Sequence, residues 1–153
     1  MKILRSGIIC LLFSVCYLAS SAQVAPLNDP GYNKPHLFSD LPQKMKVKIS
    51  DFGSLLDLPV GTSVHTLLAP GFNFQGTVVS TSPATDATVK SVVIKSNNRK
   101  GATLIFTKTI KADGTVAFLG RIISMKNGDA FEIVKENDQY VLEKKNLAEL
   151  VAE

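Results

Sequence analysis

The middle of the chain alternates between hydrophobic and polar residues, and this period of two is typical of strands with one buried face. The clearest stretch is 44–49, where Met45, Val47 and Ile49 alternate with three lysines. In a later stretch, Gly76 indicates a bulge or a close backbone contact. The pattern predicts strands over residues 44–49, 63–68, 72–81, 89–96, 102–110, 115–124, 129–135 and 140–144.

Polar turns separate the strands of the second half. Asp113-Gly114 and Asn127-Gly128 supply the positive φ angles of tight hairpins, and residues 136–138 form a further polar turn. Seven or eight short strands joined mostly by hairpins indicate an all-β fold. We therefore expect a small antiparallel barrel or sandwich, two architectures that the pattern does not separate.

Two short helices are expected beside the strands. Phe52, Leu55 and Leu56 have helical spacing, which predicts one turn of helix between the first two strands. Near the end of the sequence, Asn146 and Glu149 have the spacing of a capping box. This pair predicts a short C-terminal helix.

Residues 1–22 have the three parts of a cleavable secretory signal peptide. Lys2 and Arg5 give a positive start, residues 8–18 form an apolar run, and small residues lead up to the expected cleavage after Ala22. The apolar run is shorter than the roughly 20 residues of a membrane-spanning helix. We therefore expect an exported protein, periplasmic or extracellular, with no stable membrane insertion after cleavage.

Both cysteines of the sequence, Cys10 and Cys16, lie in this signal segment. Lipid attachment to one of them is the alternative to cleavage, but the residues before them fit a bacterial lipobox poorly. The mature chain would then depend on its hydrophobic core for stability, because it has no cysteine. The absence of cysteine and of any Asn-x-Ser/Thr sequon from residues 23–153 favours a bacterial protein.

Residues 23–42 have the composition of a proline-rich leader or linker, with four prolines. Prolines at this density disfavour regular backbone hydrogen bonding. Leu37, Phe38 and Leu41 are expected to attach the end of the leader to the domain. Residues 43–153 are expected to form a single β-rich domain.

Signal cleavage also changes the charge. Removing Lys2 and Arg5 from 17 basic and 13 acidic residues leaves 15 against 13, a net charge of +2. Residues 34–111 hold ten basic and four acidic residues, whereas residues 112–153 hold five and eight. This asymmetry would orient an oppositely charged partner, although an ordinary solvated surface explains it as well.

Few residues are available for catalysis. The mature chain has two histidines, His36 and His65, and both are expected to be ordinary surface residues. The sequence has no zinc-ligand spacing, no Gly-x-Ser-x-Gly elbow and no phosphate-binding glycine loop. Asp129 and Glu132 could form a carboxylate pair for glycoside hydrolysis, but carboxylates at a hairpin usually serve solubility. We expect no catalytic residue, metal site or cofactor; a small hydrolase without a recognisable motif is the alternative.

A basic loop is the first candidate binding site. Lys95, Arg99 and Lys100 lie close together in the sequence and would suit an acidic polymer or an acidic protein face. A loop of solvated charges is the alternative. Nucleic acid is not expected as a partner, because the aromatic residue of this region, Phe106, is assigned to the core. Three further lysines that could extend the basic group are Lys90, Lys108 and Lys111.

Arg121 is the second candidate binding residue. It is the one charged residue within the apolar stretch 118–125, both faces of which are expected to be covered. A buried arginine needs a partner, and Asp129 or Glu132 would provide one. The alternatives are a structural ion pair and recognition of a ligand carboxylate.

Residues 120–122, 128–130 and 140–142 resemble, in strand rhythm, the β-rich N-terminal pro-modules of secreted bacterial metalloproteases. The resemblance covers residues 59–145 and implies a module that binds or inhibits a protease. Such inhibitory segments typically present a cysteine or another metal ligand, and none is evident in this chain. The sequence as a whole favours an exported, non-catalytic β-domain that binds a protein or polymer in the bacterial envelope or outside the cell. A free-standing protease inhibitor is the alternative.

Overall fold

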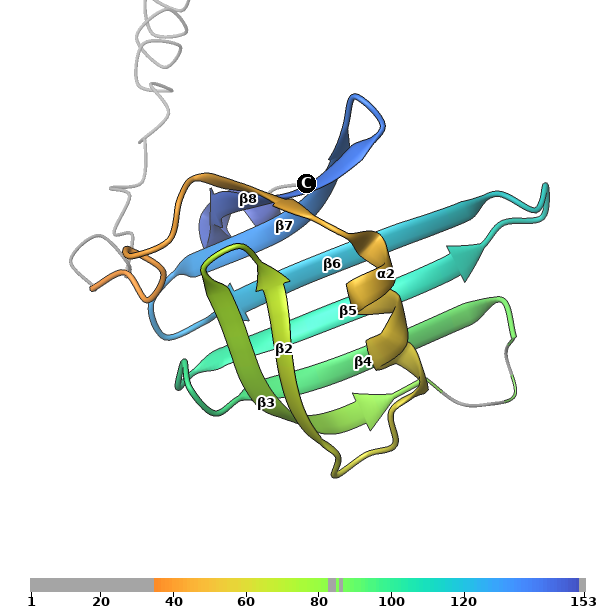
Figure 1. The fold of residues 1–153 in the computed structure, drawn as a ribbon, viewed down its shortest axis with the longest axis horizontal. Coiled ribbons are helices and arrows are strands. Elements are labelled where there is room, and N and C mark those ends of the chain that lie inside the picture. Colours follow the sequence, from red (N-terminus) through yellow and green to blue (C-terminus); the bar gives the residue numbers. More distant parts are fainter. Residues whose placement is uncertain (1–34, 83–84, 86, 152–153) are drawn as a thin grey trace, which may run out of the picture. The chain divides into compact units, whose positions relative to one another are not determined.

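A computed structural model describes residues 35–82, 85 and 87–151 of the chain (Figure 1). The expected signal peptide, residues 1–22, and the leader up to residue 34 lie outside the described residues. The elements are β1 (Lys44–Val47), α2 (Ile49–Gly53), the 3-10 helix η1 (Ser54–Asp57), β2 (Ser63–Ala69), β3 (Phe72–Thr81), β4 (Val89–Ser96), β5 (Ala102–Ile110), β6 (Val116–Ser124), β7 (Asp129–Glu136), β8 (Gln139–Asn146) and α3 (Leu147–Val151).

The eight strands form one antiparallel sheet, in the order β1-β8-β7-β6-β5-β4-β3-β2. Strands β2 to β8 follow each other as hairpins, and β1 pairs with the last strand, with Lys44 opposite Glu143. The sheet curls into a half-barrel, with α2 lying across its concave face (Figure 1). The predicted all-β class is therefore confirmed, and the architecture is a half-barrel of a single sheet.

The two glycine turns have the expected backbone. Gly114 has φ +81° and Gly128 has φ +72°. Their amides donate to the carbonyl oxygens of Lys111 and Ser124, at 2.9 Å in each case. At the β7–β8 turn, Asn137 takes a positive φ of 46° without being a glycine. Asparagine tolerates this conformation better than most residues, which explains the short turn at that place.

Gly76 makes the close contact that the sequence indicated. A Cβ at this position would lie 2.5 Å from the carbonyl oxygen of Lys95 on β4. The pairing of β3 with β4 also shifts register between Val78 and Ser80. The glycine therefore allows β4 to approach β3 closely, next to a bulge.

The core lies on the concave side of the sheet and is rich in phenylalanine. The ring of Phe52 from α2 packs on that of Phe106 from β5, with centroids 5.3 Å apart. This contact holds the short helix against the sheet, as the helical spacing around Phe52 predicts. The fully buried phenylalanines are Phe38, Phe52, Phe72, Phe74, Phe106 and Phe131.

The end of the leader is part of this core. Phe38 is fully buried, with its ring centroid 5.2 Å from that of Phe131, and Leu41 is also buried. The Lys144 ammonium donates to the carbonyl oxygens of Phe38 at 2.8 Å and Leu41 at 2.6 Å. The expected attachment through these residues is confirmed, and packing against the strands therefore begins before residue 43.

The short C-terminal helix is confirmed as α3. The Asn146 side-chain oxygen accepts from the amide of Ala148 at 3.1 Å, and the Glu149 carboxylate accepts from the amide of Asn146 at 3.4 Å. The two bonds cap the start of the helix as predicted, with the Asn146 side chain bonded to the second helical amide instead of the third. Leu150 is buried and anchors the helix to the domain.

Candidate functional site

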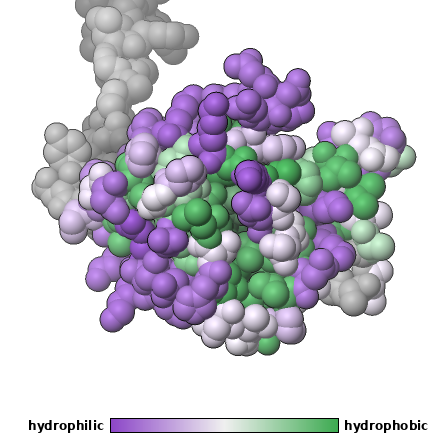
Figure 2. Space-filling view, viewed as in Figure 1, coloured by the Kyte–Doolittle hydropathy of each residue, from purple (hydrophilic) through white to green (hydrophobic). Residues whose placement is uncertain are grey.

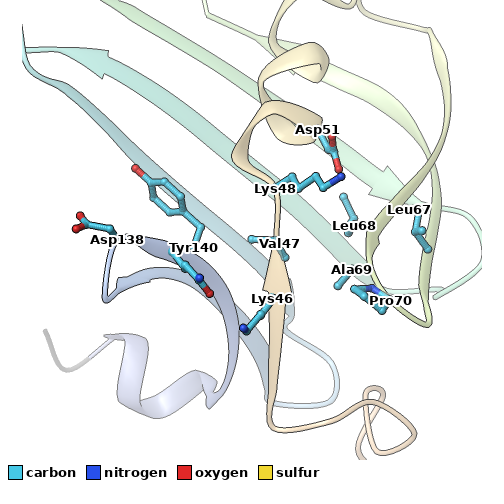
Figure 3. Close-up of a pocket in the computed structure, with 11 residues that line it drawn as sticks. Lys46, Val47, Lys48, Asp51, Leu67, Leu68, Ala69, Pro70, Asp138 and Tyr140 are labelled. Atoms are coloured by element: carbon cyan, nitrogen blue, oxygen red, sulfur yellow. The ribbon is translucent and has the colours of Figure 1, made fainter.

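A cavity of about 600 Å³ lies where the two edge strands of the sheet come near each other. We call it the seam cleft. Its lining comes from residues 46–48 of β1 and the start of α2, from residue 51, from residues 67–70 at the end of β2, and from residues 138–140 at the start of β8 (Figure 3). Ligand pockets in proteins typically measure about 300–1,000 Å³, so the cleft has room for a small ligand or a short peptide segment.

Apolar side chains form much of the cleft surface. Val47 stands at its centre, and Leu67, Leu68 and Ala69 line the opposite side (Figure 3). Leu67 is 53% exposed although it is a large hydrophobic residue. On the molecular surface, hydrophobic residues surround a hollow on the face that carries α2 and β2, with hydrophilic residues at its border (Figure 2). An exposed apolar surface bordered by polar residues is typical of a binding site.

Two lysines bring positive charge to the cleft. Lys46 and Lys48 have no ion pair within the described part of the chain, and the Lys48 side chain extends toward Asp51 (Figure 3). Asp138 is already paired with Lys135 at 2.8 Å, and this hydrogen bond lowers the pKa of the Asp138 carboxyl. Of the charged residues in the lining, Lys46 is therefore the one without an opposite charge nearby among the described residues, and it favours an occupant that carries negative charge.

The lining shows how the cleft could act chemically. Residues 46–48, 51, 67–70 and 138–140 include no histidine, serine or cysteine, and the Tyr140 hydroxyl is the sole hydroxyl among them. Nucleophilic catalysis needs a hydroxyl or thiol beside a base that activates it. No cluster of three or more His, Cys, Asp or Glu side chains suited to a metal ion occurs among the described residues. The lining offers apolar contacts and two ammonium groups to an occupant.

The expected basic loop is only partly free. Arg99 donates to both carboxylate oxygens of Asp40, at 2.8 and 2.6 Å, and to the Leu37 carbonyl oxygen at 2.9 Å. Its guanidinium also lies 5.5 Å from the centroid of the Phe72 ring. Hydrogen bonding to Arg99 lowers the pKa of Asp40, and the same bond raises the pKa of Arg99. Arg99 therefore clamps the end of the leader to the core.

The other lysines near this loop have different surroundings. Lys95 and Lys100 are exposed and make no ion pair with a described residue. Lys90 is paired with Asp57 at 2.7 Å, and this bond lowers the pKa of the Asp57 carboxyl. Of the three cations of the predicted loop, Lys95 and Lys100 keep an exposed side chain without an ion pair to a described residue, whereas Arg99 does not.

Arg121 has one of its two expected partners. Its Nε donates to Glu132 at 2.9 Å, and the two residues face each other on β6 and β7. The alternative pairing with Asp129 is wrong. The Asp129 carboxylate is buried, accepts from the amide of Phe38 at 3.1 Å and is hydrogen bonded to the His36 ring. Alternation along β7 places Asp129 and Glu132 on opposite faces of the sheet, which explains the separate partners.

Two expectations need correction, one about Asp129 and one about the stretch 118–125. Asp129 was expected to be a solubilising carboxylate at the hairpin, but it is buried and fixes the leader through Phe38. The stretch 118–125 is not covered on both faces, since Leu119 is 49% exposed and Met125 is 74% exposed. Leu119 is next to the buried Gly120 on β6, and alternation along the strand therefore places its side chain on the convex face, opposite the face that carries α2. His36 and His65 are both exposed, and His36 is also bonded to Asp129.

The seam cleft was not predicted from the sequence. The three lysines of 44–48 were visible as a polar face, and Leu67 was visible as part of a strand. Nothing in the sequence indicated that β1 pairs with β8. This pairing leaves β1 and β2 as neighbouring edge strands of the described sheet, without hydrogen bonds between them. Pairing between strands so distant in sequence leaves no local pattern.

No protein-family model, no curated protein and no solved structure matches the chain. Within the described residues, the helices are all too short or too polar to pass through a lipid bilayer.

Proposed function

We propose that this protein is an exported, non-catalytic binding domain whose partner, a protein or polymer of the bacterial envelope or cell exterior, binds at the seam cleft. Export rests on the three-part signal pattern of residues 1–22. The observation that carries the binding site is a cavity of about 600 Å³ with exposed apolar residues and two lysines that lack an ion pair within the described chain. A catalytic group is not needed for this role.

The cleft is favoured over the basic loop as the main contact. Arg99 is engaged by Asp40, so the loop offers two isolated lysines on an otherwise polar surface. Isolated surface charges contribute little to affinity, whereas desolvated apolar contacts contribute most of it. Lys95 and Lys100 would at most steer an acidic partner toward the molecule.

Site-specific photocrosslinking in the native host tests this proposal. A photoreactive phenylalanine analogue replaces Leu67 in the cleft or, as a control, Leu119 on the convex face; their exposed fractions are 53% and 49%. We expect a discrete crosslinked partner from position 67 and none above background from position 119. A partner that is a protease would favour the inhibitor alternative. Equal capture from both positions, or capture from Leu119 alone, would overturn the cleft as the binding site.

A further inference from the structure

We propose that the seam cleft takes up an extended peptide segment as an additional strand between β1 and β2, and that this segment alternates apolar and acidic residues. This inference rests on the proposed function, because it names the chemistry of the partner at the same site. Four observations carry it: the free edge of β2, the free edge of β1, the lining of the cleft, and the unbonded seam between the two strands.

The free edge of β2 presents unpaired backbone groups to the cleft. The amide of Val78 donates to the carbonyl oxygen of Thr62 at 3.0 Å, and the register of β2 with β3 continues from this pair. In an antiparallel ladder, alternate residues bond to the partner strand. Val64 and Thr66 therefore bond to β3, while the N–H and C=O of Leu67 point to the free edge. No other described residue bonds to these Leu67 groups.

The free edge of β1 also presents unpaired backbone groups to the cleft. The amide of Lys144 donates to the carbonyl oxygen of Gln43 at 2.8 Å, and the register places Met45 opposite Leu142 and Lys46 opposite Val141. Met45 therefore bonds to β8, and the backbone groups of Lys46 point away from it. Lys46 and Leu67 both line the seam cleft, so two unpaired strand edges border the same cavity.

The lining selects the side chains of the guest. Successive side chains of a strand alternate between the two faces of the sheet. Those of the guest that point to the concave side would meet Val47, Leu68 and Tyr140, which favours apolar residues. Those that point outward would lie between the exposed Leu67 of β2 and the exposed ammonium of Lys46 of β1, and Lys46 favours Asp or Glu among them. Since β1 has four residues, about four residues of the guest can pair with it.

The seam must open slightly to admit the guest. At their closest, Cα atoms of β1 and β2 lie within 8 Å of each other without forming a ladder. A strand inserted between them requires a separation of about 9.6 Å, because neighbouring strands lie about 4.8 Å apart. The widening breaks no hydrogen bond between the two strands, and β1 is the shortest strand of the described sheet. Strand addition of this kind satisfies exposed edges in many peptide complexes.

A phage-displayed library of random heptapeptides, panned against the protein purified after export, tests the proposal. We expect enriched peptides to share about four residues in which acidic and apolar residues alternate. A synthetic copy of an enriched peptide should bind, and N-methylation of alternate amides should weaken binding at least tenfold, since it removes backbone donors and leaves the side chains in place. This measurement uses the wild-type protein, so it does not depend on the folding of a variant.

Two pairs of protein variants locate the guest. Leu67→Pro removes the N–H at the free edge of β2, a place where proline is tolerated, and should weaken binding at least tenfold. Leu67→Ala keeps the N–H and should weaken it less. Lys46→Glu should weaken binding at least tenfold, whereas Lys95→Glu, an equal charge change at an exposed lysine of β4, should leave it within twofold.

The outcomes separate this inference from the proposed function. No enrichment, enrichment without alternation, or equal binding of the N-methylated peptide would each overturn strand addition. If photocrosslinking from Leu67 still captured a partner in that case, the cleft would remain the binding site for an occupant of another kind, such as a small ligand or a second copy of the chain. If crosslinking also failed, both proposals would be wrong.

Discussion

Arg99 illustrates how the role of a single residue depends on partners far away in the sequence. Three cations between positions 95 and 100 predict a basic loop, and the sequence also shows an aspartate at position 40. Nothing local connects them, because the connection is made by the burial of Phe38, which brings Asp40 beside the guanidinium. The free charge of the loop is thus smaller than its sequence indicates.

The pair of Asp40 and Arg99 gives a pH dependence of known sign. Hydrogen bonding to Arg99 lowers the pKa of Asp40 in the folded protein. The stabilisation is therefore fully present above the pKa of the unfolded chain, about 4, and is lost as the pH falls through the lower folded-state pKa. We expect wild type to be more stable than Asp40→Asn at pH 6, and the difference to shrink toward zero below about pH 3. Urea unfolding at several pH values measures it; a constant difference would contradict the account.

Two glycines permit close packing for different reasons and should respond differently to alanine. A Cβ at Gly76 would lie 2.5 Å from the backbone oxygen of Lys95, which cannot move without disturbing β4. A Cβ at Gly120 would lie 2.3 Å from Cδ1 of Ile133, the end of a flexible side chain. We expect Gly76→Ala to lower the free energy of unfolding by about 3 kcal/mol and Gly120→Ala by about 1 kcal/mol.

Chemical denaturation of both variants measures these costs. As an internal check, Ile133→Val removes the methyl group that a Cβ at Gly120 would strike, so it should recover part of the loss from Gly120→Ala. The reverse order of the two glycine costs would show that the packing around them is described incorrectly.

At the scale of elements, hydrophobic β-forming runs between turn signals were enough to predict the strands. The ranges 72–81, 89–96 and 102–110 agree with β3, β4 and β5, because each run is bounded by clear turn residues. The first strand was expected to reach residue 49, but β1 ends at Val47 and α2 begins at Ile49. Phe52 is buried against Phe106, and this tertiary contact draws the chain into a helix early.

The attachment of the leader to β7 was beyond a sequence argument. Asp129 follows a turn, where an acidic residue is usually exposed. Its carboxylate nevertheless accepts a hydrogen bond from the amide of Phe38, a residue 91 positions away. Hydrogen bonds from groups that would otherwise be unpaired offset the free-energy cost of removing a carboxylate from water. This interaction assigns residues 36–38 to the fold.

Removing the charge of Asp129 tests this attachment. Asp129→Asn keeps the size of the side chain but weakens the acceptor for the Phe38 amide, and we expect a loss of about 1–2 kcal/mol in the free energy of unfolding. The segment around residues 35–42 should also become more sensitive to limited proteolysis. His36→Gln serves as the control: it removes the exposed ring that bonds one Asp129 oxygen but leaves the bond from the Phe38 amide to the other, so it should cost less. Unchanged stability and protection in Asp129→Asn would contradict the attachment.

At the scale of the whole molecule, the sheet is complete except at one place. The strands from β2 to β8 are joined in sequence by hairpins, and β1 pairs with β8 at the other end of the sheet. The two edge strands, β1 and β2, therefore face each other at the seam cleft. Exposed strand edges invite pairing with another chain, and proteins usually cover or charge them. Here Lys46 of β1 and the following Lys48 border the opening, and in the proposed complex their charge favours an occupant with acidic residues.

The class of the fold could be predicted because it depends on strand number and turn chemistry, both of which are local. The seam could not, because it depends on which strand lies beside the first one. The sequence therefore placed the candidate site at a loop of lysines, whereas the apolar cavity lies at Lys46, a lysine without an ion pair in the described part of the chain, about 50 residues earlier in the sequence. The exposure of Leu67, a large hydrophobic residue, is the observation that favours the seam cleft over the basic loop as the candidate site.

Amide hydrogen exchange at single-residue resolution, in the free protein and in complex with a captured partner or an enriched peptide, shows whether the partner pairs with the edges of the seam cleft. We expect fast exchange at Lys46 and Leu67 in the free protein and at least tenfold slower exchange in the complex. Val64 and Thr66, whose amides bond to β3, should be slow in both states. A complex in which Lys46 and Leu67 exchange as fast as in the free protein would show that the partner does not pair with the edges of the seam cleft.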